Sequence, residues 1–491
     1  EIKGAAELMP IQRWFFERHT VEPHHYNHAV MLHRKDGFDE TALRLTMDQV
    51  AIHHDALRMV FRSTEAGYAA WNRGIDEGEL YTLDIVDMRQ VEDQAAAVQA
   101  QADAIQASFH LEDGPLFKLG LFHCNDGDHL LIVIHHLLVD GVSWRILFED
   151  IATGYEQALN GKAIVLPQKT DSYLVWSEQA AKYAAGPALD KERSYWQQIE
   201  ETVLAPLPKD LDQEPGTIRD TESVTVTWSA EETDLLLRQA NRAYHTETND
   251  LLLTALGAAI QRWTGMEQIL VNLEGHGREM IVPDLDITRT VGWFTTQYPV
   301  LLNLQGGQEV SAQIKRIKEN LREVPHKGIG YGLLKYMAPE KGTRFSVEPE
   351  VSFNYLGQFD QDLEGNALSL STHSVGKALS DHTPQQYALD VNGMIAEGQL
   401  SLTITYSNRQ YRKETVSHFA ELLQSSLSEV IQHCVTQERS QLTPSDVLFQ
   451  GLTLEQLDRL TAQTAHIGEI EDVYKLTAMQ KGMLFHSLLE P

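Results

Sequence analysis

The 491-residue sequence contains few of the features that nucleic-acid-binding, disulfide-stabilised and membrane-spanning proteins need. Lys and Arg number 40 against 70 for Asp and Glu, so the formal charge is −30, which disfavours binding to nucleic acid and to anionic membrane surfaces. The two cysteines, Cys124 and Cys434, indicate buried thiols in a reducing compartment rather than a disulfide framework. The longest apolar stretches, such as LLLTALGAAI, are too short to cross a bilayer.

The amino terminus lacks a basic region followed by an apolar one, so the sequence predicts no secretory signal and a cytoplasmic protein. The chain also lacks an initial Met, which indicates a fragment of something longer. Its length exceeds one typical hydrophobic core and predicts two lobes. The Pro-, Asp- and Glu-rich stretch LAPLPKDLDQEPG is the best candidate for the connection between them.

The stretch IVIHHLLVDGVSWRILFEDI, residues 132–151, organises the front half of the chain. The apolar run LLIVI predicts a strand buried on both faces that ends at His135 and His136. Successive strand side chains point to opposite faces, so one of the two histidines should be structural. After a turn at Asp140 and Gly141, apolar residues follow at helical spacing, so a helix should pack back on the sheet.

A histidine doublet alone is weak support for a catalytic site here. The chain has 21 histidines and two further doublets, beginning at His24 and His53, and most such pairs are structural. The spacing of HH, three residues and DG resembles the active-site signature of the chloramphenicol-acetyltransferase-like superfamily, and this resemblance implies that His136 is the catalytic histidine. Metal binding is the alternative, since His and Asp are ligands, but no third and fourth ligands follow at a recognisable spacing, so we expect no metal there.

A second strand end, in the segment QILVNLEGHGREM, offers a carboxylate. The apolar strand ends at Glu274, and Gly275 and Gly277 follow, which allow close approach of a substrate or unusual backbone angles. An isolated glutamate is usually solvated, but one placed at the end of an apolar strand is a better candidate for a site. An imidazole and a carboxylate from the two halves would meet in a cleft between lobes.

Two other segments bear on the site. VSFNYLGQF places Asn354 and Tyr355 on an otherwise apolar strand, where Tyr355 is either part of the core or reaches a cavity with its hydroxyl. VPHKGIGYGLL is glycine-rich, but it lacks the Gly-Lys-Ser/Thr ending of a phosphate loop, so we expect no nucleotide.

Seven strings occur in an order that resembles one family, namely PIQRWFF, HHLLVDGVSW, NDLLLTALG, EGHGRE, RTVGWFTTQYP, PHKGIGYG and FNYLGQF. They resemble the epimerization domains of nonribosomal peptide synthetases, which belong to the chloramphenicol-acetyltransferase-like superfamily. The resemblance runs from about Pro10 to about Asp446. It implies an α/β fold with mixed sheets, in which two acetyltransferase-like lobes, residues 1–205 and 206–446, form a V with a tunnel at their junction.

By this resemblance the substrate is an aminoacyl or peptidyl thioester on the phosphopantetheine arm of a carrier domain, and its α-carbon is inverted from L to D. The resemblance implies that His136 and Glu274 are the catalytic pair, one on each face of that carbon. Which of them removes the proton of the L-form stays open, and His136 is alternatively a cation that stabilises the enolate. We expect no cofactor bound by the domain itself.

The remaining candidate residues are expected to support this pair. Besides the structural member of the doublet, His135, and the turn residue Gly141, Asp140 is expected to be structural and to pair with Arg278 of EGHGRE across the lobes. Asn354 and Tyr355 are candidate hydrogen-bond donors near the thioester.

Residues 447–491 are predicted to contain a linker and the truncated start of a following domain. KLTAMQKGMLFHSLLEP resembles the start of a condensation domain, although Ala478 replaces the expected proline. The expected partners are an upstream peptidyl carrier domain and a downstream condensation domain of the same polypeptide, and the excised fragment should be a monomer. The sequence does not specify which amino acid is inverted.

Two other functions fit parts of this pattern. The first is a condensation-type acyltransferase that joins the cargo of two carriers through His136. The second is a non-catalytic module that only docks carrier domains. Condensation domains share the histidine motif but resemble EGHGRE, GWFTT and FNYLGQF poorly, so Glu274 is the residue that separates epimerization from condensation.

Overall fold

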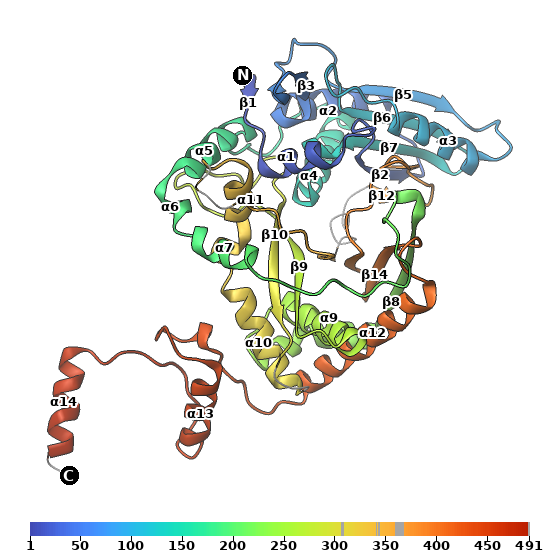
Figure 1. The fold of residues 1–491 in the computed structure, drawn as a ribbon. Coiled ribbons are helices and arrows are strands. Elements are labelled where there is room, and N and C mark those ends of the chain that lie inside the picture. Colours follow the sequence, from blue (N-terminus) through green and yellow to red (C-terminus); the bar gives the residue numbers. More distant parts are fainter. Residues whose placement is uncertain (306–308, 340, 342–343, 359–367, 490–491) are drawn as a thin grey trace.

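The computed structural model describes residues 1–305, 309–339, 341, 344–358 and 368–489. Phe359, the last residue of FNYLGQF, and residues 490–491 of the predicted downstream domain lie outside the described residues. Figure 1 shows two lobes, each built on a β-sheet with helices packed against it, and a C-terminal extension that leaves the second lobe. Both large sheets contain parallel and antiparallel pairs, so the predicted mixed α/β class is confirmed.

The front lobe is built on a five-stranded sheet. Its order is β12 (Ser369–Leu370), β2 (Asn27–Arg34), β7 (Gly127–His135), β6 (Phe117–Cys124) and β5 (Thr82–Asp87). Its helices are α1 (Pro10–Arg18), α2 (Glu40–His53), α3 (Gln94–Gln106) and α4 (Gly141–Leu159). A smaller sheet beside it contains β1 (Gly4–Ala6), β4 (Gly67–Asn72) and β3 (Met59–Thr64).

Strand β7 is buried on both faces, as the apolar run predicts. Its residues from Asp128 to His135 are all buried, and it pairs antiparallel with β2 on one side and β6 on the other. Helix α4 then begins at Gly141 and packs against α2. The His135–His136 doublet is therefore held at the end of the central strand of this sheet.

The back lobe is built on a six-stranded sheet. Its order is β10 (Thr296–Asn303), β9 (Gln268–Gly275), β11 (Val351–Gln358), β13 (Leu389–Ala396), β14 (Gln399–Ser407) and β8 (Thr221–Thr227). Its helices are α8 (Ala230–Arg238), α9 (Thr248–Thr264), α10 (Val310–Arg322) and α12 (Lys413–Val435), and α9 and α12 pack closely against each other.

The back sheet has one apolar and one polar face because residue types alternate along its central strands. In β9, Val271 and Leu273 are buried in the hydrophobic core, whereas Asn272 and Glu274 point to the other side. The register of β11 and β13 places further polar side chains on that same side, at Ser352, Asn354, Asp390 and Asn392. One face of the sheet thus covers the core, and the other offers polar groups to a site.

Two connections join the lobes. The chain leaves the front lobe through helices α5 (Tyr173–Ala185), α6 (Pro187–Asp190) and α7 (Arg193–Glu200). The segment LAPLPKDLDQEPG follows them and forms no helix or strand. Helix α11 (Ile329–Tyr336) packs against α1 and α5. Strand β12 returns from the back half to pair with β2, with Leu370 opposite Leu32. The front sheet is therefore completed by a strand that follows it by more than 200 positions in the sequence.

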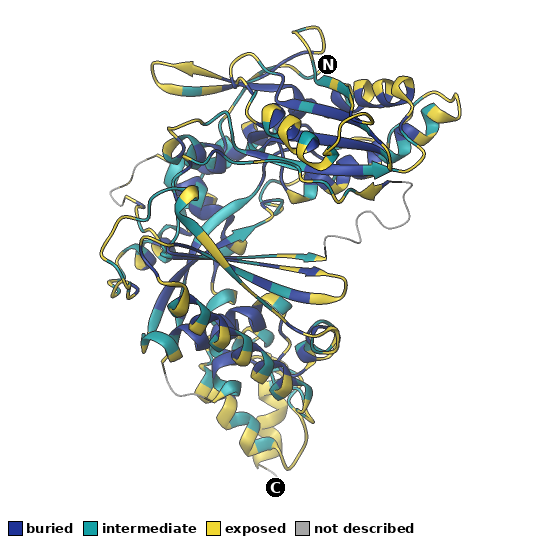
Figure 2. Cartoon of the chain, turned by 90° about the vertical axis from the view of Figure 1, so that its right-hand side faces the viewer, coloured by how far each residue is buried: buried dark blue, intermediate teal, exposed yellow. Residues whose placement is uncertain are grey.

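The C-terminal extension carries α13 (Leu454–Thr464) and α14 (Ala478–Leu489). Lys315 of α10 binds Asp458 of α13 at 2.8 Å, whereas no described residue of α14 is buried. Figure 2 shows this exposure against the buried strands of both sheets. Within the described part of the chain, every helix is either too short or too polar to span a membrane.

Candidate active site

The two adjacent histidines at the end of β7 occupy different environments. His135 is fully buried, its Nε2 lies 2.8 Å from the Pro23 carbonyl oxygen, and its Nδ1 accepts the Leu137 N–H at 3.1 Å. Both ring nitrogens are therefore used within the protein. His136 begins a 3₁₀ turn, η2 (His136–Leu138), and its half-buried side chain lines a cavity.

Contacts around His136 fix the orientation and tautomer of its ring. Its Nδ1 lies 2.9 Å from the Val139 carbonyl oxygen, which can only accept, so Nδ1 carries the hydrogen and Nε2 keeps its lone pair. The ring stacks on Trp293 with centroids 4.1 Å apart, and the His28 ring lies 3.8 Å away. Nε2 is consequently the atom that can accept a proton.

His136 is neutral near pH 7 in this environment. Burial lowers its pKa to about 4, and burial also lowers the pKa of His28 well below the usual value. The Trp144 indole N–H donates to His28 Nδ1 at 3.1 Å, which fixes the second ring as well. A neutral His136 fits a proton acceptor better than a permanent cation that would stabilise an enolate.

Glu274 stands at the end of β9, opposite Gln297 of β10. The turn that follows requires glycine: Gly277 has φ +72°, and a Cβ there would lie 1.6 Å from the Phe294 carbonyl oxygen. Glu274 Oε2 accepts a hydrogen bond from Asn354 Nδ2 at 2.9 Å. The Glu274 carboxyl group is thus held by Asn354 of the neighbouring strand, and the turn that follows has no room for a side chain at position 277.

Burial, together with a second carboxyl group, raises the pKa of Glu274 to about 7. The second group is Asp390 of β13, whose own pKa burial raises to about 6. Asn354 of β11 lies between their two strands, and Asn392 donates to Asp390 Oδ1 at 3.2 Å. Glu274 therefore exchanges a proton near neutral pH, as a general acid or base must.

Asp140 and Arg278 lie in direct contact between the lobes. Arg278 Nη2 is 3.0 Å from Asp140 Oδ1, and both side chains are at most 8% exposed. Asp140 caps α4 by accepting the Ser143 N–H at 2.9 Å, and it also accepts the Phe294 N–H at 3.0 Å. Arg278 lies over the Phe294 ring at 4.1 Å and donates to the Thr290 carbonyl oxygen at 2.6 Å. The pair ties the helix after the histidines to the segments around the carboxylate.

We expect either Asp140→Ala or Arg278→Ala to reduce the free energy of unfolding by about 3–5 kcal/mol, because each leaves a buried charge without its partner. Urea denaturation of both single variants and the double variant should give a coupling energy of about 0.5–3 kcal/mol. The same cycle on Asp87 and Arg89, whose side chains are 50% and 57% exposed, should give at most about 1 kcal/mol. Additive effects of Asp140 and Arg278 would contradict the coupling.

One cavity of about 1360 Å³ collects the candidate residues from both halves of the chain. The residues that line it include His136, Asp140, Gly141, Glu274, Asn354 and Tyr355. No atom lies within 4 Å of a Cβ built at Gly141, so a side chain there would project into open space. Of the predicted set, only His135 and Arg278 do not line this cavity. His136 and Glu274 therefore line one and the same cavity.

Three residues that shape this site were not predicted from the sequence. His28 and Trp293 contact the His136 ring, and Asp390 raises the pKa of Glu274. Trp293 belongs to the string GWFTT, so its motif was a usable signal. His28 and Asp390 lie in strands whose polar residues resemble any solvent-facing alternation.

Comparison with known proteins identifies relatives of this chain. The family model for the condensation domain matches residues 2–453. One subunit of the mycosubtilin synthase of Bacillus subtilis is 55% identical over 491 residues, which is 100% of this chain and 19% of that protein. Gramicidin S synthase 1 of Brevibacillus brevis is 42% identical over 469 residues, or 93% of this chain and 43% of that protein. The chain thus spans less than half of either relative.

Solved structures of related domains also resemble this chain. The epimerization domain from the third module of tyrocidine synthetase B is 42% identical, with a TM-score of 0.84 over 89% of this chain and 98% of that one. The condensation domain of the Monacolin K polyketide synthase has a TM-score of 0.70 at 16% identity, over 89% of this chain and 98% of that one, which shows a common fold. The chain therefore belongs to the condensation-domain family of nonribosomal peptide synthetases.

Proposed function

We propose that this domain epimerizes the α-carbon of an aminoacyl or peptidyl thioester, from L to D, while a carrier domain holds the substrate on its phosphopantetheine arm. The observation that carries the proposal is the shared cavity, which His136 lines from the front lobe and Glu274 from the back lobe. The 42% identity to a synthetase epimerization domain over 98% of its length supports it.

The proposed reaction moves one proton off the α-carbon and another onto its opposite face. One group of the pair removes the α-proton, and the C–H electron pair passes into an enolate of the thioester. The other group then donates a proton to the opposite face, and the enolate collapses to the inverted thioester. No electrons leave the substrate, so the step requires no oxidant and no cofactor bound by this domain.

Asn354 is suited to stabilise the enolate as well as to position Glu274. An amide NH₂ has two hydrogens, and Asn354 uses one of them toward Glu274 Oε2. The second is available for a thioester oxygen in the cavity, which Tyr355 also lines.

The protonation states suit a two-group reaction. His136 is neutral near pH 7, whereas Glu274 has a pKa of about 7 and is present in both forms. Inversion in one direction uses ionised Glu274 as the base and protonated His136 as the acid, and inversion in the other uses neutral His136 as the base and protonated Glu274 as the acid. Each direction thus needs a pair that holds one proton in total, so both rates should fall together as pH rises through 7 and Glu274 loses its proton.

Asp390→Asn tests this assignment through pH dependence. The Asp390 carboxylate disfavours ionisation of Glu274, so its removal should lower the pKa of Glu274. We expect the rates of L-to-D and D-to-L conversion to fall together as pH rises, and this fall to begin at lower pH in the variant, as measured by rate profiles between about pH 5 and 9. Asp36→Asn, which changes an exposed residue, should leave both profiles in place. Unshifted profiles in the Asp390 variant would show that Asp390 does not act on the titrating group.

A condensation-type acyltransferase remains the second candidate, because the family model is that of a condensation domain and the fold is common to both activities. The proposed partners are an upstream carrier domain and a condensation domain downstream in the same polypeptide. We further propose lobes over residues 1–205 and 206–446, apart from β12, followed by a linker and the start of that downstream domain over 447–491.

The function is tested by loading the upstream carrier with an L-aminoacyl or L-peptidyl group, adding this chain and following the D/L ratio after hydrolysis. A second carrier loaded with an acceptor amino acid is present in a parallel reaction. Epimerization predicts D-product in both reactions and no new peptide bond. A peptide product of unchanged configuration would instead assign the domain to condensation.

A further inference from the structure

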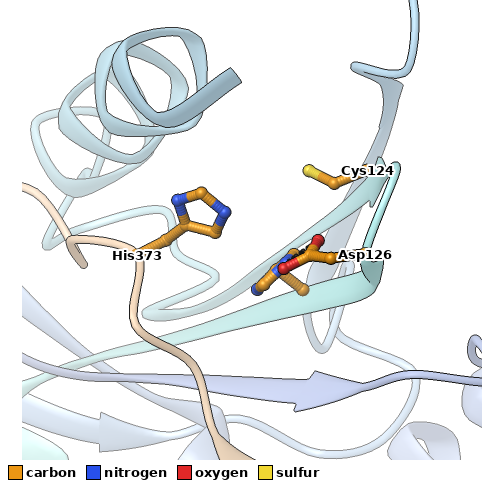
Figure 3. Close-up of side chains that lie close together, drawn as sticks. Cys124, Asp126 and His373 are labelled. Atoms are coloured by element: carbon orange, nitrogen blue, oxygen red, sulfur yellow. Dashed lines mark hydrogen bonds and ion pairs between the residues drawn. The ribbon is translucent and has the colours of Figure 1, made fainter. Parts of the chain in front are cut away.

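A group of four potential metal ligands lies outside the pair described above. Cys124 is the last residue of β6, Asp126 lies in the turn that follows, and His129 lies on β7. His373 comes from the segment after β12, which belongs to the back half of the chain. Figure 3 shows the Cys124, Asp126 and His373 side chains converging between the β6–β7 hairpin and that segment.

The four side chains offer a complete donor set for one ion. One ligand atom from each, the sulfur, a carboxylate oxygen and two imidazole nitrogens, lies within 4.8 Å of all the others. Cys124 is 5% and His129 1% exposed, whereas Asp126 is open to solvent and gives an ion a route of entry. Thiolate, imidazole and carboxylate ligands in a four-fold set are typical of zinc and of tetrahedral cobalt.

Hydrogen bonds already orient two members of the group. His129 Nε2 lies 2.8 Å from Asp126 Oδ1, and its Nδ1 lies 2.6 Å from Ser371 Oγ. The same serine hydroxyl accepts the backbone N–H of His373 at 3.0 Å. Ser371 therefore holds the His129 ring, as the outer hydrogen bonds of histidine ligands do in metal sites, and also holds the backbone at His373.

The described residues contain one other close group of such side chains, His53, His54 and Asp150, but its carboxylate is already paired with a cationic side chain. Asp150 already binds His54 at 2.6 Å and Arg289 at 2.7 Å, so its carboxylate charge is neutralised by protein groups. In the group at the β6–β7 hairpin, no Lys or Arg of the described residues makes an ion pair with Asp126. Asp126 contacts only histidine rings, His129 at 2.8 Å and His33 at 3.9 Å, among the described ion-pairing residues, so no permanently charged side chain neutralises it.

We propose that Cys124, Asp126, His129 and His373 bind one divalent ion of the zinc class. The ion would join the front-lobe hairpin to the segment that returns from the back lobe. Leu370, Ser371, His373 and Val375 of that segment line the cavity that contains His136 and Glu274. A metal at this position would fix one wall of the cavity and add stability to the whole chain, without taking part in proton transfer.

The test uses the 491-residue chain after removal of metal with a chelator. Titration with Co²⁺ should give one bound ion per chain, with a thiolate-to-cobalt charge-transfer absorption, and Zn²⁺ should displace it and raise the melting temperature. Cys124→Ser should remove the absorption, and His373→Ala should remove the rise in melting temperature. Ser371→Ala should weaken the affinity about 10–100-fold.

Two matched variants serve as controls. Cys434→Ser removes the other buried thiol, and His53→Ala alters the group whose carboxylate is already neutralised, so both should bind Co²⁺ as the unaltered chain does. The proposal is overturned if the unaltered chain binds no Co²⁺ or Zn²⁺, because that result is independent of how any variant folds. It is also overturned if Cys124→Ser keeps the same stoichiometry and absorption.

Discussion

Glu274→Gln should reduce epimerization by about 10²–10⁴-fold, which is the usual contribution of one general acid or base. Glutamine has the same shape, and its side-chain oxygen can still accept the hydrogen bond that Asn354 donates at 2.9 Å. The variant therefore removes proton exchange while keeping the cavity intact. The measurement is the rate at which a carrier-bound L-substrate gains the D-configuration and takes up deuterium at the α-carbon from D₂O.

Glu421→Gln, on an exposed position of α12, provides the matched control and should epimerize at the unaltered rate. The same substitution at Glu274 also separates the two candidate functions. A condensation reaction through His136 would not depend on this carboxylate. Undiminished peptide-bond formation by Glu274→Gln would therefore favour acyl transfer. Normal deuterium uptake by Glu274→Gln from both the L-form and the D-form would exclude Glu274 as one of the two groups.

His136→Ala should have an effect of similar size, about 10²–10⁴-fold, because Nε2 is the free proton-accepting atom of the ring. The change also removes the ring that stacks on Trp293 and contacts His28, so stability must be followed by thermal unfolding alongside activity. We expect the loss of rate to exceed greatly what the unfolded fraction explains. Added imidazole, which fits the space left by the ring, should restore part of the activity.

His418→Ala, at an exposed position of α12 that does not line the cavity, is the control for loss of an imidazole and should retain full activity. The two active-site variants should also differ from each other. If each group serves one face, one variant loses α-proton removal mainly from the L-form and the other mainly from the D-form. Inversion at the normal rate in His136→Ala would refute the assigned pair.

The elements that carry the site were predictable from local sequence patterns. The run LLIVI ending at two histidines predicted β7, and the apolar strand before Glu274 predicted the end of β9. The expectation that Asp140 and Arg278 pair across the lobes matches a contact at 3.0 Å. Each of these features depends on periodicity, on turn residues or on a charged residue beside an apolar strand.

Features that depend on strand pairing were not predictable in this way. His28 contacts His136 because β2 pairs with β7 in the register that sets His28 opposite Ile134. Asp390 acts on Glu274 because three strands from distant parts of the chain, β9, β11 and β13, lie side by side. A single sequence shows which residues alternate along a strand but not which strands become neighbours.

The pairing of β12 with the front sheet also depends on which strands become neighbours, so local patterns do not predict it. Strand β12 has two residues, which are too few to show an alternating pattern. They pair with Leu32 and His33 because the back-half chain returns across the junction. This return also brings His373 to Cys124 and His129, which are far from it in sequence. The proposed lobe boundary at residue 205 therefore follows the order of the chain, whereas β12 and His373, which come after it, pack with the front lobe.

The most direct test of the account is a single-turnover reaction in D₂O with a carrier-bound L-substrate that has hydrogen at its α-carbon. If His136 and Glu274 lie on opposite faces of that carbon, the proton removed and the proton returned belong to different groups. Each D-configured product molecule should then carry one deuterium from solvent. D-product that retains the original hydrogen, or the absence of both D-product and α-deuterium, would contradict the account.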